Sequence, residues 1–371
     1  MGSIALCGRC KVPALVGAEL GWENSGAIVS KTSPPNRWVF FESESIDTLF
    51  RGVEEIIGVP IENIIIESRR RESRQYIDRL FPQEAKEVFR SLNDPQMKAE
   101  DRKARRTAAQ GVLNNIYDIA RIFGYAGITM SPAAWETDEP FPWRFGVVHH
   151  PYSVPFQVAE SLGTCEAFEG IDMWVKYEKT GEDIYEYEFY PSEHPVGLAE
   201  RFKVKRYEFK PGEIAYDHCP ECGVPAEISR YVWDLEKGSI TDPDTGRRMA
   251  IFGPHSLDAI FVDLEEELGE DITLTIIEAQ RRYIKSSWST EKWLRGVDDF
   301  KRLTALRGMG NITSFDADRE RVVVHVENTA LLAFQVGIVQ ALVEMAYGVD
   351  SSTCDWESFD DGDMSITIKV R

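Results

Sequence analysis

Two short stretches of the chain carry cysteines at a spacing that is typical of metal sites. They are "LCGRCKVPA", with Cys7 and Cys10, and "HCPECGVPA", with Cys219 and Cys222. Two thiolates three residues apart can ligate one ion while the following backbone N–H groups hydrogen-bond to the sulfurs. Four thiolates would complete a closed tetrahedral Zn²⁺ site with Zn–S distances of about 2.3 Å. The sequence therefore predicts one zinc per chain, shared by the two pairs.

Three alternatives use the same cysteines. Each pair could bind its own metal, with Asp217 or His218 helping the second pair. Iron or an iron–sulfur cluster would suit the same four thiolates. A redox-active dithiol is the third, but such pairs usually lie at a helix N-terminus after a strand, and Val-Pro so soon after the second cysteine does not favour this. A closed four-thiolate site leaves no open coordination position, so we expect a structural metal.

A second group of residues could line a ligand pocket. The stretch "FGVVHHPYSVPF" supplies His149, His150 and Tyr152, and Cys165 follows in "LGTCEAFEG". His325 of "VVVHVEN" falls near His149 when the two halves are aligned. Such imidazoles could ligate a metal or haem, or hydrogen-bond a small molecule. A strand-end histidine and a buried structural thiol are the plainer interpretations.

Duplicated charges follow an apolar segment in each half. Glu67, Arg70 and Arg71 correspond to a second set, Glu278, Arg281 and Arg282. Helical i,i+3 and i,i+4 ion pairs explain them better than acid–base catalysis does. The chain contains no Walker loop, Gly-x-Gly-x-x-Gly, Gly-x-Ser-x-Gly or His-Glu-x-x-His motif, which disfavours an enzyme without excluding one.

The two cysteine stretches belong to a longer internal repeat. Val12, Pro13 and Ala14 match Val224, Pro225 and Ala226 at the same offset as the cysteines. "RWVFFESESIDTLFRGVEEIIG" then runs against "RMAIFGPHSLDAIFVDLEEELG", and "FQVAESLGTCEAFEGID" against "FQVGIVQALVEMAYGVD". This pattern predicts a duplicated domain, with a first copy at 1–205, a helical insert at about 74–124, and a second copy at 206–371. Pseudo-twofold symmetry would bring the two cysteine pairs together.

Each copy is expected to contain the same elements. A short β region precedes a helix at 45–58 or 256–269, with Ser45 or Ser256 as N-cap and Gly58 or Gly269 closing it. The apolar "NIIIE" and "TLTIIE" are expected to be strands, or passages from strand to helix. Polar-faced helices follow at about 74–124 and 289–308, and each copy ends as strand, helix and hairpin. The predicted fold class is α+β, with helices packed on antiparallel sheet.

The end of each copy resembles the 4-vinyl-reductase family of small-molecule-binding domains, relatives of the haem–nitric-oxide-binding fold. An apolar helix closed by Gly348 precedes a hairpin with Gly362 and Asp363 at its turn, and the first copy has Gly170 followed by "TGEDIYEYEF". The family's usual cysteine after Gly-Asp is Ser365 or Tyr185 here. The resemblance implies a ligand-sensing or carrier domain with an apolar pocket beneath the helix, suited to a hydrophobic or tetrapyrrole-like ligand. "CPECG" likewise resembles a zinc-ribbon knuckle.

Composition narrows the expected partners. The 371 residues carry 42 Lys and Arg against 62 Asp and Glu, a formal charge of −20, which repels nucleic acids and anionic membranes. Without an apolar run long enough to span a membrane or a basic leader, we expect a cytoplasmic protein. The leading hypothesis is a zinc-stapled small-molecule-binding protein. The alternatives are an enzyme of small-molecule metabolism, of the reductase or tetrapyrrole-processing type, and an interaction protein that pairs with a protein partner or with itself.

Overall fold

A computed structural model describes residues 4–131, 144–198, 208–269, 271–288 and 296–370. The predicted α+β class is confirmed, since helices pack on antiparallel sheets. The chain forms two compact units, each assembled from segments that are distant in sequence. Unit 1 contains Met1–Ala5, Ile61–Glu200 and Val232–Ala250, and unit 2 contains Leu6–Pro60, Arg201–Tyr231 and Ile251–Arg371. Both units therefore draw on both halves of the sequence, and the predicted border at 205/206 lies outside the described residues.

Unit 1 is built on a four-stranded antiparallel sheet of order β4-β5-β7-β6. Its strands are β4 Gly127–Met130, β5 Phe145–His149, β6 Met173–Gly181 and β7 Ile184–Pro191. Helix α7, Val154–Glu169, is apolar on most of its circumference because it is buried between the sheet and α3, Glu62–Leu80. Gly163 allows this close packing, since a Cβ there would collide with the backbone of α3. The left-handed Gly170 ends α7, as the sequence predicts.

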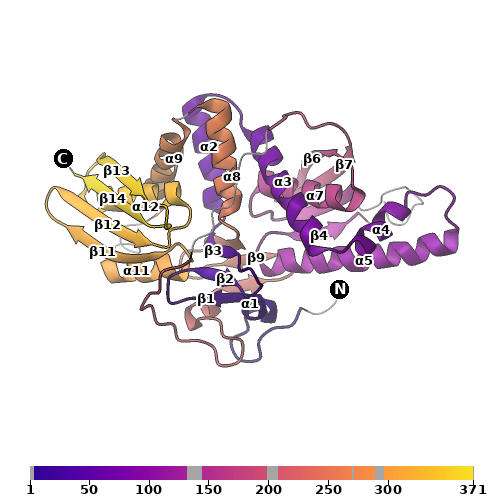
Figure 1. Cartoon of the computed structure of the whole chain (residues 1–371), viewed down its shortest axis with the longest axis horizontal. Coiled ribbons are helices and arrows are strands. Elements are labelled where there is room, and N and C mark those ends of the chain that lie inside the picture. The colour runs from indigo at the N-terminus through magenta and orange to yellow at the C-terminus, as the bar shows by residue number, and fades with distance from the viewer. Residues whose placement is uncertain (1–3, 132–143, 199–207, 270, 289–295, 371) are drawn as a thin grey trace. The chain divides into compact units, whose positions relative to one another are not determined.

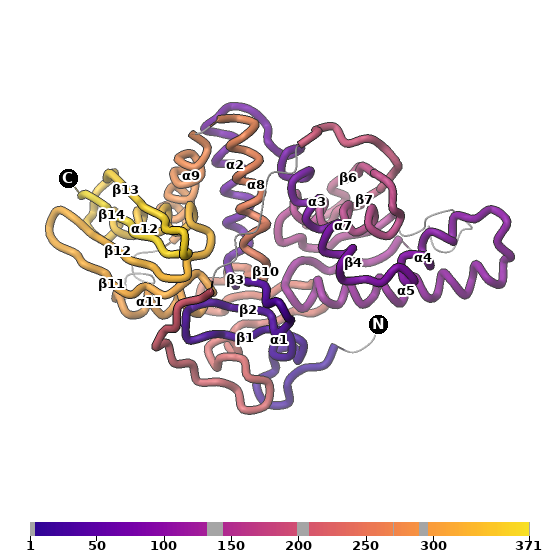
Figure 2. Tube along the Cα trace, in the orientation of Figure 1, coloured from indigo at the N-terminus to yellow at the C-terminus, as the bar shows by residue number. Residues whose placement is uncertain are grey.

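Two further helices extend unit 1 and lie within residues 74–124, the range of the predicted insert. They are α4, Gln83–Ser91, and α5, Ala99–Ile122, which pack against each other as a hairpin (Figure 2). The ring of Phe89 on α4 stacks on that of Phe168 on α7, with centroids 4.3 Å apart. This contact attaches the hairpin to the rest of the unit.

Unit 2 repeats the strand order of unit 1. Its four-stranded sheet has the order β11-β12-β14-β13, with β11 Asn311–Ala317, β12 Arg321–Glu327, β13 Thr353–Ser358 and β14 Met364–Lys369. Figure 1 shows α12, Leu332–Tyr347, against this sheet. The left-handed Gly348 ends α12. Unit 2 also contains the helices α2 Glu44–Ile57, α8 His255–Leu268, α9 Ile272–Ser287 and α11 Val297–Leu306.

Short strands flank the cysteine stretches. The first set follows helix α1, Ala14–Glu19, and comprises β1 Leu20–Trp22, β2 Ile28–Ser30 and β3 Arg37–Glu42, paired antiparallel. The second set follows the 3₁₀ helix η2, Ala226–Arg230, and comprises β8 Val232–Asp234, β9 Ser239–Thr241 and β10 Arg248–Phe252, also antiparallel. The predicted β regions after both cysteine pairs are therefore confirmed.

The expected strands at "NIIIE" and "TLTIIE" are wrong, because both segments lie inside helices, α3 and α9. Clustered β-branched residues favour strands. Here tertiary packing decides instead: Ile66, Arg70 and Ile77 are buried at helical spacing on one face of α3. The predicted helix at 289–308 is described only from Gly296 onward, where α11 is found.

The predicted N-caps are also displaced. Helix α2 begins at Glu44 with Ser43 as its cap, and α8 begins at His255 after Pro254. Ser45 lies inside the first turn, where its hydroxyl donates to Glu42 O at 2.5 Å. The glycine stops are correct: Gly58 and Gly269 end these helices with positive φ. Among the described residues, no helix has both the length and the apolar character needed to cross a bilayer.

Candidate metal centre

The four predicted cysteines come together in unit 2. Their sulfurs all lie within 4.8 Å of one another, with Cys7 Sγ 3.7 Å from Cys219 Sγ and Cys10 Sγ 3.4 Å from Cys222 Sγ. A tetrahedral site with Zn–S bonds of about 2.3 Å has sulfur–sulfur edges of about 3.8 Å. The separations fit such an edge, and they are far longer than the ~2.05 Å of a disulfide bond. The cluster has the size of a four-thiolate metal site.

Each cysteine pair lies in its own backbone turn, and the two turns have the same conformation. In the first, Cys7 N donates to Val12 O at 2.9 Å, and in the second Cys219 N donates to Val224 O at 2.8 Å. The residue after the second cysteine of each pair is left-handed, with φ 65° at Lys11 and 76° at Gly223. In each turn a following backbone N–H group donates to the second sulfur of the pair, that of Val12 to Cys10 and that of Val224 to Cys222.

Backbone hydrogen bonds already favour one thiolate. The N–H groups of Cys222 and Glu221 donate to the sulfur of Cys219 and lower the pKa of that thiol to about 6. Burial acts the other way at Cys10, raising its pKa to about 12, and burial also raises the pKa of Cys222. A bound cation would remove the remaining protons, because metal coordination requires thiolates.

Contacts around the sulfurs hold the two turns against each other. Gly8 N donates to Glu221 Oε1 at 2.7 Å, joining the tips of the two turns. Gly17 of α1 lies so close to Cys222 that a Cβ there would collide with the Cys222 carbonyl oxygen. Cys7 and Cys219 are buried, with 2% and 7% of their surface exposed. A metal held here would be shielded on most sides.

The geometry weighs on the alternatives for these cysteines. Among the described residues, the cluster of potential metal ligands at this place consists of the four cysteines, and Asp217 and His218 are not part of it. The His218 ring instead contacts Gly223 O through Nδ1 at 2.7 Å. All four thiols are free, and each pair lies in a turn instead of at the start of a helix. Shared coordination accounts for this arrangement better than separate sites or a redox dithiol.

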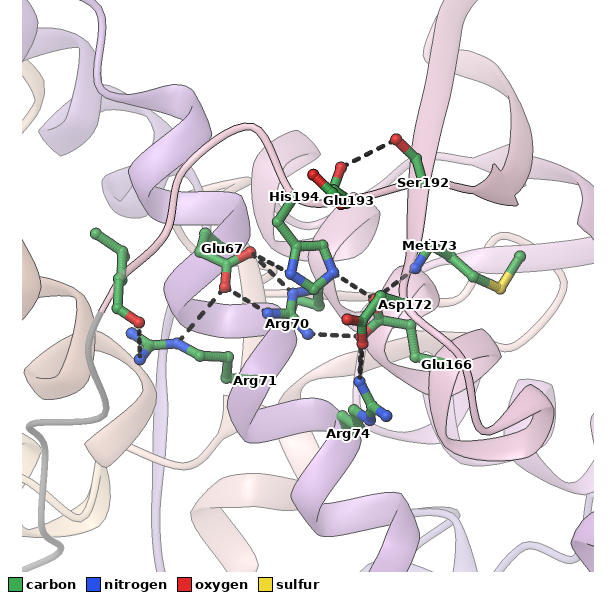
Figure 3. A network of polar contacts seen from close by, with 11 residues as sticks. Glu67, Arg70, Arg71, Arg74, Glu166, Asp172, Met173, Ser192, Glu193 and His194 are labelled. Carbon is green, nitrogen blue, oxygen red and sulfur yellow. Dashed lines mark hydrogen bonds and ion pairs between the residues drawn. The ribbon is translucent and has the colours of Figure 1, made fainter.

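A second polar cluster lies in unit 1, between α3 and α7 (Figure 3). Glu166 is fully buried at its centre: one carboxylate oxygen accepts from Arg70 Nη1 at 2.6 Å, and the other contacts His194 Nε2 at 2.7 Å and Met173 N at 2.9 Å. Arg74 bridges the same carboxylate, at 3.6 Å, to Asp172, at 2.8 Å. Glu166, Asp172 and His194 lie close enough to hold a metal. Two arginines already neutralise these carboxylates, so the cluster is described better as an ion-pair network.

Unit 2 contains a corresponding network. Arg281 pairs with Glu278 at 2.7 Å on its own helix and with Glu344 of α12 at 2.6 Å, and Lys285 also donates to Glu344, at 2.8 Å. The predicted helical ion pairs Glu67–Arg70 and Glu278–Arg281 are thus confirmed. The sequence interpretation missed their buried partners on α7 and α12. The sequence did contain a sign of these partners, since Glu166 aligns with Glu344 in the two matching stretches that begin with "FQV".

The proposed ligand residues are dispersed. His149 ends β5, and His150 follows at φ 51° with Nδ1 3.5 Å from Asp183 Oδ2 at the β6–β7 hairpin. Tyr152 is buried, stacks on Tyr125 and donates to Glu160 Oε1 at 2.7 Å. His150 and Tyr152 thus contact protein groups, and none of the three residues lines the crevice described below.

The other two proposed residues occupy ordinary structural positions. Cys165 belongs to the apolar core of unit 1, where burial raises its pKa above the usual range. In unit 2, His325 lies on the exposed face of β12, whose alternate residues Val324 and Val326 are buried. Neither position favours ligation of a metal or haem.

A crevice that the sequence did not locate lies beneath α12 in unit 2. Its empty space is about 330 Å³ when the solvent at its open mouth is counted, and only about 20 Å³ of it can hold the centre of a water molecule. The polar groups in its wall are engaged: Arg307 pairs with the buried Glu42 at 2.9 Å, and Trp288 Nε1 donates to the same carboxylate at 3.2 Å. The remaining surface is mostly apolar. The lining consists of Phe41, Trp288, Phe300, Leu303, Thr304, Arg307, Met309, Gln335, Ile338 and Val339.

The features that suggested the 4-vinyl-reductase family are present in the structure, namely an apolar helix ended by a left-handed glycine and a following β-hairpin in each half. These features are common to many α+β folds, so the resemblance stays a prediction. Comparisons of the chain with protein-family models, with curated proteins and with solved structures gave no match.

Proposed function

We propose that the chain is a small-molecule-binding protein whose fold depends on one structural zinc ion. The zinc is held by Cys7, Cys10, Cys219 and Cys222. The observation that carries this assignment is the cluster of four sulfurs within 4.8 Å of one another, with two separations, 3.4 and 3.7 Å, close to a tetrahedral edge. Zinc is favoured because it commonly takes four thiolates in closed structural sites. Iron in the same cage would give visible absorption, which distinguishes the two metals.

The role of the zinc is structural on two grounds. Four protein ligands leave no position for water or substrate, whereas catalytic zinc keeps one open. The site also joins chain segments that are 212 residues apart, so it closes a long loop. Closing a loop of that length is entropically costly, and a metal that binds only the folded state supplies free energy to offset it.

The proposal includes duplication of an ancestral domain related to the 4-vinyl-reductase family. Three structural parallels support it: the two four-stranded sheets have the same strand order, the two cysteine turns have the same hydrogen bonds, and the two Glu–Arg–Glu networks occupy matched positions. A pseudo-twofold relation of the two turns about the zinc is the simplest origin of a four-cysteine site from a two-cysteine repeat.

Ligand binding is proposed at the crevice beneath α12. Ligand pockets are concave and mostly apolar, with volumes of about 300–1,000 Å³. The crevice as it stands is far smaller than that range, with about 20 Å³ that can hold the centre of a water molecule. Its apolar lining suits a neutral hydrophobic molecule, which would bind only as the lining side chains move apart. Because Glu42 neutralises Arg307, the site offers no net charge to an anion. None of the predicted ligand residues lines this crevice, namely His149, His150, Tyr152, Cys165 and His325.

The zinc role is tested by chelation of the purified protein. We expect loss of one zinc per chain and a fall in the unfolding temperature, because the metal binds the folded state. Replacing Cys7 and Cys219 together by serine should have the same effect, whereas Cys354→Ser, which alters a thiol outside the cluster, should keep both zinc and stability. A stable, metal-free wild-type protein would refute the role.

The ligand role is tested with a neutral apolar fluorophore whose emission rises in apolar surroundings. Val339→Trp fills the crevice, and the matched control Ser161→Trp places the same side chain at the corresponding position of α7 in unit 1. We expect saturable binding that weakens at least tenfold in Val339→Trp and is retained in Ser161→Trp. Absence of saturable binding to the wild type, or equal binding to both variants, would reject the crevice.

A further inference from the structure

Each set of short strands packs beside the four-stranded sheet that is formed by the other half of the sequence. We call Leu20–Glu42, which contains β1–β3, the first ribbon, and Val232–Phe252, which contains β8–β10, the second ribbon. In unit 2, Trp22 Nε1 of the first ribbon donates to Leu306 O at 2.9 Å, at the end of α11. In unit 1, Trp233 Nε1 of the second ribbon donates to Ile122 O at 3.0 Å, at the end of α5. Each ribbon thus contacts a helix from the other half of the sequence.

Glycine contacts on the ribbons repeat this pairing. Gly26, in the first ribbon, has φ 76°, and a Cβ there would lie 2.5 Å from Gly310 O. Gly238, in the second ribbon, has φ 63°, and a Cβ there would collide with Ala126 O. Both glycines are required by the left-handed backbone and by the close approach of a chain segment just before a sheet.

The segments that receive the ribbons also correspond. Gly308 follows α11, and a Cβ there would meet Trp38 O at 2.7 Å and Ile28 of the first ribbon. Gly124 follows α5, and a Cβ there would meet Met249 O at 2.7 Å and Ile240 of the second ribbon. Ile28 and Ile240 are matched positions of the repeat. The same set of contacts therefore occurs twice, each time between different halves.

Further hydrogen bonds join each ribbon to the segment on which it packs. Phe40 N of β3 donates to Arg307 O at 3.0 Å, and Arg37 donates to Gly308 O at 2.8 Å. Arg248 of β10 donates to Pro151 O at 2.9 Å and to Tyr125 O at 3.1 Å. These acceptors are backbone carbonyls, so the ribbons complete the hydrogen bonding of the segments that they cover.

We infer that the two halves of the chain exchange their ribbons, so that each half completes the sheet domain of the other. The exchange depends only on the contacts within each unit. Its origin rests on the proposed duplication: a protein with a single such half would pair with a second copy of itself, swapping ribbons and sharing the zinc through two cysteine pairs. In this chain each half occupies the surface that a second copy would cover in such a dimer.

The exchange has a consequence that zinc alone does not produce. If each ribbon packed on its own half, residues 1–205 and 206–371 would lose the ribbon contacts described above and keep those of the cysteine site and of α2 with α9. With exchange, both compact units contain segments of both halves. Cutting the chain between Lys205 and Arg206 should then leave two fragments that stay together even after the metal is removed.

The direct test is photo-crosslinking in the full chain. A benzophenone amino acid replaces Trp22 or Trp233, and the control position is Tyr177, whose OH donates to Glu62 within the first half at 2.7 Å. A protease site is inserted between Lys205 and Arg206. After irradiation, cleavage and denaturation, the position-22 and position-233 proteins should give products containing both fragments, which mass spectrometry maps near Leu306 and Ile122. Position 177 should link within one fragment. Products confined to one fragment at positions 22 and 233 would overturn the exchange.

A second measurement needs no change to a buried tryptophan. The chain carrying only the protease site is cleaved under native conditions and passed over a sizing column with and without chelator. We expect a single complex of both fragments in both conditions. Separation in either condition overturns the inference. The zinc content of the same samples reports on the proposed metal site independently, so failure of that proposal would be seen separately.

Discussion

At the scale of single residues, the two cysteine turns offer a natural comparison. Both require a left-handed residue after the second cysteine, and the chain uses Gly223 in one turn and Lys11 in the other. A side chain in this conformation costs about 1–2 kcal/mol, which glycine avoids. Lys11 is the strained member of the pair, although its ammonium group donates to Gly8 O at 2.8 Å.

We therefore expect Lys11→Gly to stabilise the protein. Relief of the left-handed strain, less the entropy that glycine gains in the unfolded chain, should raise the free energy of unfolding by about 0.5–1 kcal/mol. Gly223→Ala is the matched control: a Cβ there meets no atom within 4 Å, so its expected loss of about 1 kcal/mol is purely conformational. Urea unfolding of the zinc-loaded proteins measures both. A destabilised Lys11→Gly protein would contradict this account of the turn.

The buried carboxylate Glu166 gives a second prediction at this scale. Glu166→Gln removes the charge that faces Arg70, whose side chain is 5% exposed, and should cost about 3–5 kcal/mol of unfolding free energy. Glu344→Gln is the matched change in unit 2, where Arg281 is 16% exposed and water can compensate in part. Denaturant titration should show the larger loss for Glu166→Gln. Equal losses, or a larger loss for Glu344→Gln, would contradict a role for burial.

At the scale of elements, the sequence patterns predicted the features that depend on neighbouring residues, such as the ends of helices. Gly58, Gly170 and Gly348 end helices as expected, and the closing helix and hairpin of each half are present. The isoleucine-rich start of α3 was misjudged because β-branched residues favour strands locally, whereas packing against α7 selects a helix. Packing of that kind depends on residues almost a hundred positions away, and local patterns do not record it.

The ribbons supply the prediction at this scale. Gly238→Ala should lower the free energy of unfolding by at least about 2 kcal/mol, because it adds left-handed strain and a collision with Ala126 O. Gly111→Ala, in the middle of α5 where a Cβ meets no atom within 4 Å, should instead raise it by about 0.5–1 kcal/mol. Thermal or urea unfolding compares the two. A neutral Gly238→Ala would show that the second ribbon is not packed against this segment.

At the scale of the whole molecule, the candidate site was predicted better than its surroundings. The four cysteines could be identified because thiolate spacing is a local property and the repeat supplied the second pair. The crevice beneath α12 could not, since Phe41, Trp288 and Val339 come from three distant segments. Local patterns also could not predict the composition of the compact units, because the ribbons pack on segments about a hundred or more residues away in the sequence.

The most direct test of the central claim is the metal content of untagged, gently purified protein, measured beside its absorption spectrum. We predict one zinc per chain without a visible band. Replacing either cysteine pair by serine should remove that zinc, because all four thiolates would be needed for the one site. Two zinc ions per chain, or one zinc retained after the loss of a single pair, would show separate sites and contradict the shared centre.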